Sequence, residues 1–106
     1  LVRAQELRVD VRGALPDHLV DRPEVVLPSQ SSGARLLHVH ENRPGMLGAI
    51  NEVIGESSAN VDAQFLRTYE DVGYVVTDVD LGREEALRLE GALRRVEGTL
   101  RSRVLF

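Results

Sequence analysis

The segment HVHENRPGML, residues 38–47, holds the densest group of side chains that could do chemistry. Two histidines lie two positions apart, followed by an acid, an amide, a base and a Pro-Gly pair. Alternate residues of a strand point to the same side, so His38 and His40 could chelate a metal. The third histidine, His18, lies in a proline-rich region, and the chain has no cysteine. We therefore expect a mixed polar sheet face here and no metal site.

Independent catalysis finds no support in the sequence. A nucleophile needs a base and an oxyanion site, and no G-x-S-x-G motif is present. Ser57 and Ser58 fit a helix end, whereas Glu84 and Glu85 fit a helix start, where acids complement the dipole. Neither a G-x-G-x-x-G nor a G-x-x-x-x-G-K-[ST] motif offers a nucleotide or phosphate cradle. We expect no catalytic residue and no cofactor in this chain.

The remaining chemistry of the segment is ligand binding at a helix start. Asn is a favourable N-cap, so we expect Asn42 to cap a helix that has Pro44 in its first turn. Unpaired N–H groups and the positive dipole end there suit a carboxylate, and a small zwitterion would fit. Residues that could surround it are His40, Asn42, Arg43, Gly45 and, from the neighbouring strand, Asn60. The alternative stays open that Asn42 only caps and Asn60 only turns the chain.

The elements that must position this segment follow from the hydrophobic pattern. The predicted order is strand 35–41, a helix that follows Asn42 and fades at Ser57–Ser58, strand 60–70, strand 72–82, helix 83–98 and strand 99–106. The apolar stripes of the two helices are Leu47, Ile50 and Ile54, and then Ala86, Leu89, Leu93 and Val96. This order predicts an α+β, ferredoxin-like βαββαβ fold, with a four-stranded antiparallel sheet and both helices on one face.

The sheet face away from the helices is predicted to be polar. Its expected members are His38, Asp62, Gln64, Tyr74, Asp78, Arg101 and Arg103. In the first strand, Leu37 and Val39 would then lie on the opposite side from the histidines. We also expect Asp78 and Asp80 to pair with Arg101 or Arg103 across strands.

The first 34 residues differ in composition from the rest. They contain three of the four prolines and the run SQSSG, which are typical of a linker. The stretch ELRVDVR at 6–12 alternates like a strand, but nothing adjacent offers a hairpin partner. We predict an N-terminal extension at 1–34, with a possible extra strand at 6–12, and one domain at 35–106.

Composition excludes several classes of function. The net charge of −4 and the lack of basic blocks argue against nucleic acid. The absence of cysteine excludes disulfides and thiolate zinc sites, and the absence of lysine excludes mechanisms that need a lysine amine. No apolar run approaches the ~20 residues that span a bilayer, and no signal peptide is visible. We expect a cytoplasmic protein that does not associate with membranes.

Residues 35–106 also resemble a known family. The combination of HENRPG, ANVDAQ, GYVV and the closing GTLRSRVLF is similar to the C-terminal ACT domain of bacterial D-3-phosphoglycerate dehydrogenase. The preceding RPEVVLP looks like the segment that leads into that domain. The resemblance implies the βαββαβ ACT fold, a small-molecule ligand that is usually an amino acid, and regulation of an attached enzyme.

The resemblance further implies a shared ligand site. In that family two ACT domains pair edge to edge into one continuous sheet, and L-serine binds at their interface as a feedback inhibitor. The implied contacts are His40, Asn42 and, from the partner chain, Asn60, with Arg43, Pro44, Gly45 and Val61 lining the site. NAD is implied only for an attached catalytic domain. We expect a homodimer formed through the first strand and helix.

The sequence is compatible with three kinds of ACT protein. The chain could be the regulatory piece of a longer enzyme, a free-standing ACT protein that senses another amino acid, or a dimerisation module with a vestigial site. One departure from the family pattern is Ser58, where glycine is common. Ser58 must therefore turn the chain without the conformational freedom of glycine.

Overall fold

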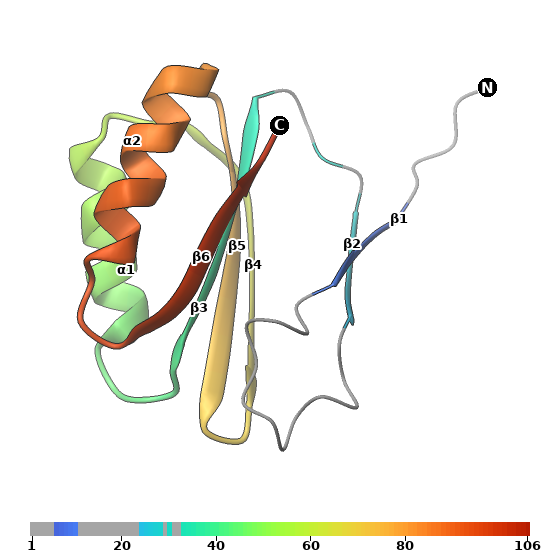
Figure 1. The fold of residues 1–106 in the computed structure, drawn as a ribbon, viewed down its shortest axis with the longest axis vertical. Helices are drawn as coiled ribbons and strands as arrows, with labels where there is room; N and C mark the ends of the chain where they lie inside the picture. Colours follow the sequence, from blue (N-terminus) through green and yellow to red (C-terminus); the bar gives the residue numbers. More distant parts are fainter. Residues whose placement is uncertain (1–5, 11–23, 29, 31–32) are drawn as a thin grey trace. The chain divides into compact units, whose positions relative to one another are not determined.

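The computed structural model describes residues 6–10, 24–28, 30 and 33–106, which form two compact units, Leu1–Gln30 and Ser31–Phe106. In the first unit, β1 (Glu6–Asp10) pairs antiparallel with β2 (Glu24–Pro28), as Figure 1 shows. The sequence offers the strand at 6–12 no adjacent hairpin partner. The partner is missed in the sequence because it lies farther along the chain, in EVVLP. His18 lies outside the described residues.

The second unit has the predicted order of elements. These are β3 (Ala34–Glu41), α1 (Met46–Glu56), β4 (Val61–Tyr69), β5 (Val72–Val79), α2 (Arg83–Arg94) and β6 (Thr99–Leu105). The sheet is antiparallel throughout, in the order β4-β5-β3-β6, and both helices cover one of its faces (Figure 1). The ferredoxin-like βαββαβ fold is confirmed.

The sheet order corrects one expectation about assembly. β3 has β5 on one side and β6 on the other, so its backbone hydrogen-bonding groups are already used. Dimerisation through the first strand is therefore excluded as an edge-to-edge contact. Within the described sheet the strands that can accept another chain are β4 and β6.

The main core lies between the helices and the sheet. The predicted stripes are confirmed at Ile50 and Ile54 in α1 and at Ala86, Leu89 and Leu93 in α2, all of which are buried. Met46 is also buried, whereas Leu47 and Val96 pack against the core only in part. The sheet contributes Ala34, Leu36, Val75 and Val79.

The prediction of which face of β3 packs against the helices is wrong. Leu37 and Val39 were expected on that face, but they lie on the other one. Leu36 belongs to the helix-side core, and His38, two residues later, shares its face. Gln64 also faces the helices, because its Nε2 donates to Asn51 Oδ1 of α1 at 2.9 Å. The prediction failed because the run LLHV carries apolar residues in both phases of a strand. Periodicity alone then cannot decide which phase is inside.

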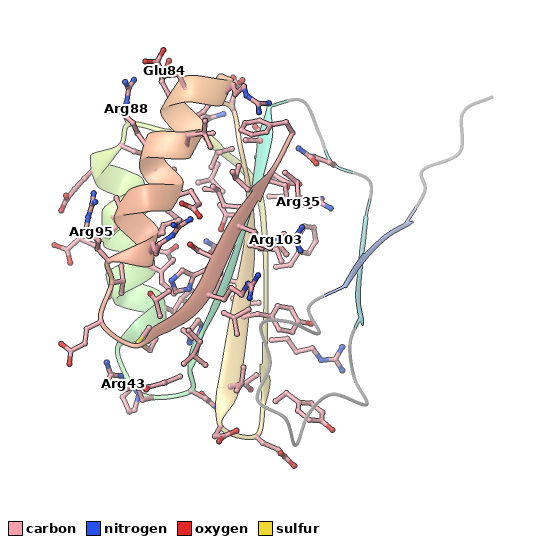
Figure 2. All side chains as sticks on the ribbon, in the orientation of Figure 1. Arg35, Arg43, Glu84, Arg88, Arg95 and Arg103 are labelled. Carbon is pink, nitrogen blue, oxygen red and sulfur yellow. The ribbon has the colours of Figure 1, made fainter. Side chains whose placement is uncertain are left out.

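The other sheet face carries a buried ion pair. Arg35 donates two hydrogen bonds to Asp78, from Nε to Oδ1 at 2.6 Å and from Nη2 to Oδ2 at 2.8 Å. The two residues are cross-strand partners and their side chains are 0% and 2% exposed. Figure 2 shows Arg35 and Arg103 on the face away from the helices. The predicted partners Arg101 and Arg103 are wrong for Asp78, since Arg35 lies directly opposite on the central strand.

Replacement of Asp78 by alanine tests this pair. Asp78→Ala leaves the Arg35 guanidinium buried without its counterion, so we expect a loss of roughly 3–5 kcal/mol in the free energy of unfolding. Urea denaturation measures it. Glu84→Ala is the matched control, because the Glu84–Arg88 pair is exposed and contributes less than about 1 kcal/mol. Equal losses in the two variants would contradict this account of the pair.

Candidate functional site

The loop from β3 to α1 is organised by Asn42, but not as a cap. Asn42 Nδ2 donates to Glu70 O at 2.9 Å, and its backbone N–H donates to Asp71 O at 2.9 Å. Both acceptors lie in the turn between β4 and β5. Asn42 therefore ties the end of the central strand to the tip of this hairpin, and the predicted N-cap role is wrong.

Helix α1 begins later than predicted because of Gly45. Gly45 occupies the N-cap position with φ 87°, in the left-handed region that glycine adopts without strain. No side chain in the described part of the chain caps this helix. Pro44 precedes the helix rather than lying in its first turn. A Cβ built on Gly45 would meet nothing within 4 Å, so its backbone is open to a ligand.

The two histidines have separate roles, although their rings are only 5.6 Å apart. His40 Nδ1 lies 2.9 Å from Glu41 O. A carbonyl can only accept, so Nδ1 carries the proton and Nε2 is the acceptor of the neutral ring. His40 is 6% exposed and lies near the Asn42 loop, where the sequence predicted a ligand contact.

His38 is a core residue. Its Nε2 lies 2.8 Å from Thr99 Oγ1, whose single proton goes to Leu93 O, so His38 must donate through Nε2. Its Nδ1 is buried and has no partner among the described residues. Burial, and then the charge of nearby His40, lowers the pKa of His38 to about 4. Within the described part of the chain, no group of three His, Cys, Asp or Glu residues could hold a metal ion.

Arg43 extends in a different direction from Asn42. Its guanidinium lies near Glu41 at 3.5 Å and Glu97 at 4.0 Å. A Cβ on Gly98 would come within 2.8 Å of Nη2, so Arg43 lies against the turn between α2 and β6 (Figure 2). Within this loop, the Asn42 side chain therefore points toward the end of β4, and the Arg43 side chain points toward the start of β6.

Asn60 lies far from Asn42 in the same chain. Asn60 directly precedes β4 and accepts a backbone hydrogen bond from Asp80 at 2.9 Å, whereas Asn42 meets the turn at the other end of β4. A strand of nine residues spans roughly 30 Å. The expectation that Asn60 could reach the helix start from a neighbouring strand is therefore wrong within one chain, because β5 separates β4 from β3. Val61 beside it is 42% exposed.

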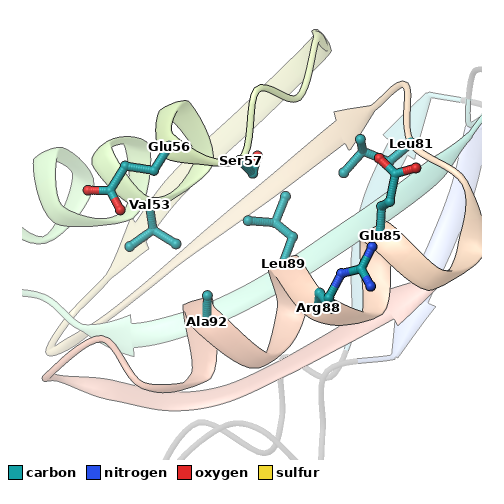
Figure 3. A pocket seen from close by; sticks show the side chains of 8 residues that line it. All are labelled: Val53, Glu56, Ser57, Leu81, Glu85, Arg88, Leu89 and Ala92. Atoms are coloured by element: carbon teal, nitrogen blue, oxygen red, sulfur yellow. The ribbon is translucent and has the colours of Figure 1, made fainter.

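A pocket that the sequence did not predict lies between the helices. Its volume is about 370 Å³, and Figure 3 shows it between the end of α1 and the start of α2. It is lined by Val53, Glu56, Ser57, Leu81, Glu85, Arg88, Leu89 and Ala92. Periodicity could not have found it, because the pocket depends on how the two helices pack against each other.

Comparison with known proteins identifies the class of domain. The chain belongs to the AHAS small subunit-like ACT domain family, whose model matches residues 36–101. The ACT domain from GTP pyrophosphokinase of Chlorobium tepidum, solved by crystallography, has the same fold, with a TM-score of 0.62 at 22% identity. That match covers 68% of this chain and 95% of the solved one.

The similar curated proteins are D-3-phosphoglycerate dehydrogenases. The chain is 45% identical to that of Haemophilus influenzae and 42% identical to that of Escherichia coli K12, over 87 residues in each case. The matches cover 82% of this chain but 21% of each relative, so the chain spans about a fifth of their length. The resemblance found in the sequence is confirmed: this is an ACT regulatory domain like that of D-3-phosphoglycerate dehydrogenase. Neither described helix is long and apolar enough to cross a membrane.

The pKa of His38 predicts a specific pH dependence of stability. Between pH 6.5 and about 4 the unfolded chain binds a proton at His38 that the folded chain does not. The stability contribution of neutral His38 is therefore complete above pH 6.5 and falls by roughly 3 kcal/mol as the pH drops to 4. Urea unfolding of wild type and His38→Gln at pH 7.5 and pH 4.5 measures it. If the two proteins lose equal stability on acidification, His38 is not the cause.

Proposed function

We propose that this domain binds L-serine between two copies of the chain and thereby regulates an attached, NAD-dependent D-3-phosphoglycerate dehydrogenase of the cytoplasm. The observation that carries the proposal is the placement of Asn42 and Asn60 at opposite ends of the edge strand β4. Both residues belong to the serine contacts that the family resemblance implies. One chain cannot bring them together, but two chains can.

The edge strand supplies the geometry. In the described sheet β4 is an edge strand with β5 as its neighbour, and its Val61 and Leu66 are 42% and 55% exposed. Suppose two copies of Val61–Tyr69 pair antiparallel about a two-fold axis, with full overlap. Phe65, the central residue, then lies opposite itself, and the start of one strand lies opposite the end of the other. Asn60 of the partner subunit would then approach Glu70, which is held by Asn42.

Each group at this place suits one part of a small amino acid. With Nδ2 of Asn42 held by Glu70, its Oδ1 is the atom that can accept from an ammonium group. The first intrahelical bond of α1 runs from Ala49 N to Gly45 O. The N–H groups of Leu47 and Gly48 precede it and suit the carboxylate. His40 Nε2 can accept from the ammonium or from the serine hydroxyl. Arg43, Pro44 and Val61 as lining residues remain predictions.

A shared site links ligand binding to assembly. A ligand that contacts both chains stabilises the paired state by mass action and shifts the population of conformers available to the attached enzyme. By reciprocity, whatever alters the pairing alters the affinity for serine. The chain itself supplies the sensor, and NAD chemistry would belong to the catalytic domain.

Titration calorimetry with L-serine tests the binding. We expect heat from the wild-type chain and an affinity at least about tenfold weaker in Asn42→Ala and in Asn60→Ala, since each removes a polar contact to a charged ligand. Asn51→Ala is a matched control, because Asn51 is an exposed amide on α1 that contacts Gln64. Thermal shifts with a panel of other amino acids extend the test. Stabilisation by a different amino acid alone would overturn the assignment of serine.

Cross-linking tests which edge pairs. The chain has no cysteine, so a single introduced thiol gives a clean result. In an antiparallel pair centred on Phe65, Phe65→Cys lies opposite itself, with Cα atoms about 4.5–5.5 Å apart, which is within the range that a disulfide spans under mild oxidation. Ser102→Cys, at the middle of β6, is the control for the other edge. Covalent dimers from Ser102→Cys, with none from Phe65→Cys, would contradict the β4 interface.

A further inference from the structure

Gly73 of β5 lies beneath the ring of His40. We propose that Gly73 is a positioning residue, whose missing side chain sets the orientation in which His40 meets the ligand. The inference rests on the proposed function and adds a residue that does not itself contact the ligand.

Gly73 and His40 lie too close together for a side chain at position 73. A Cβ built on Gly73 would lie 2.5 Å from Cε1, 3.1 Å from Nε2 and 3.2 Å from Nδ1 of His40. Contacts under 3.0 Å essentially do not occur for real Cβ atoms. Since three ring atoms are involved, the imidazole lies over Gly73, and any side chain at this position must displace it.

The backbone gives no other reason for glycine at this position. Among the residues that the structure describes, the glycines with positive φ are Gly33, Gly45 and Gly98, and Gly73 is not one of them. Glycine inside a strand is costly because it loses more conformational entropy on folding than other residues. A glycine in a strand often marks a place where another group approaches closely. Here the approaching group is the His40 ring.

The His40 ring is tilted toward β4, which is the side on which we propose that the ligand site is completed. Gly73 pairs with His40 on β3 and with Thr68 on the edge strand β4. A ring that lies over Gly73 therefore leans toward β4, the edge where Asn60 of the partner subunit would approach. The hydrogen bond between Nδ1 and Glu41 O fixes the second feature, because it leaves Nε2 as the acceptor. Gly73 sets where the ring lies, and Glu41 sets which nitrogen accepts.

The test is a double-mutant cycle in the full 106-residue chain. Gly73→Ala should weaken L-serine binding about tenfold, the effect of one lost polar contact, and should lower the melting temperature. In the His40→Ala background, Gly73→Ala should lower neither the L-serine affinity nor the melting temperature, since the ring that the new Cβ would meet is absent. Gly91→Ala is the control, because its Cβ would meet nothing within 4 Å.

A spectroscopic measurement separates positioning from general destabilisation. Nitrogen chemical shifts of His40 should report a proton on Nδ1 in the wild type and a changed tautomer balance in Gly73→Ala. Equal losses from Gly73→Ala with and without His40, or unchanged shifts and affinity, would overturn the proposal. If wild type binds no serine, the proposed function fails. The coupling in melting temperature and the shifts still decide whether Gly73 positions His40.

Discussion

The hydrogen bonds from Asn42 to the turn at Glu70 and Asp71 are the constraint on which the candidate site depends. They hold the end of the central strand β3 against the tip of the β4–β5 hairpin, although about thirty residues separate the two segments. The loop that follows is thereby brought beside the edge strand. The ladder between β3 and β5 brings Glu41 opposite Val72, and the two bonds of Asn42 extend this attachment by one residue into the loop.

The sheet order places the residues held by Asn42 beside an edge strand. β3 is internal and cannot pair with another chain, whereas β4 is at the edge and ends where Asn42 is held. This corner therefore lies beside an edge strand of the described sheet, where our proposal places the second chain. The same corner contains His40, whose ring lies over Gly73, and Gly45, whose backbone is open. The polar groups of the corner come from β3, the loop and α1. In our proposal the partner subunit adds its Asn60.

Much of the fold could be predicted from the sequence, because it depends on local periodicity. The order of strands and helices and the buried positions Ile50, Ile54, Leu89 and Leu93 followed from spacing alone. Which face of β3 packs against the helices could not be predicted, since apolar residues occur on both faces of the strand. In addition, the hydrogen-bond partner of buried His38 is Thr99, which is distant in sequence. The end of α1 was predictable, and Ser58 there adopts φ 61°, as the family departure required.

The site was harder to predict, because its geometry is set by contacts that are not local. Asn42 has the residue type of a cap, yet its partner is a carbonyl 28 positions away. Arg35 and Asp78 pair across 43 positions, which no periodicity indicates. The role we infer for Gly73 also depends on strand register, which fixes only when the sheet forms. What the sequence did supply was the set of residue types, His40, Asn42 and Asn60, from which a site could be assembled.

The most direct measurement of a shared site is to mix two defective chains. Asn42→Ala and Asn60→Ala chains, unfolded and refolded together, should form mixed dimers in about half of the pairs. Each mixed dimer has one site with both asparagines intact and one with neither, so about a quarter of all sites should bind L-serine with wild-type affinity in calorimetry. Each variant refolded alone should show none. No recovery in a mixture that demonstrably contains mixed dimers would contradict a site built from two chains.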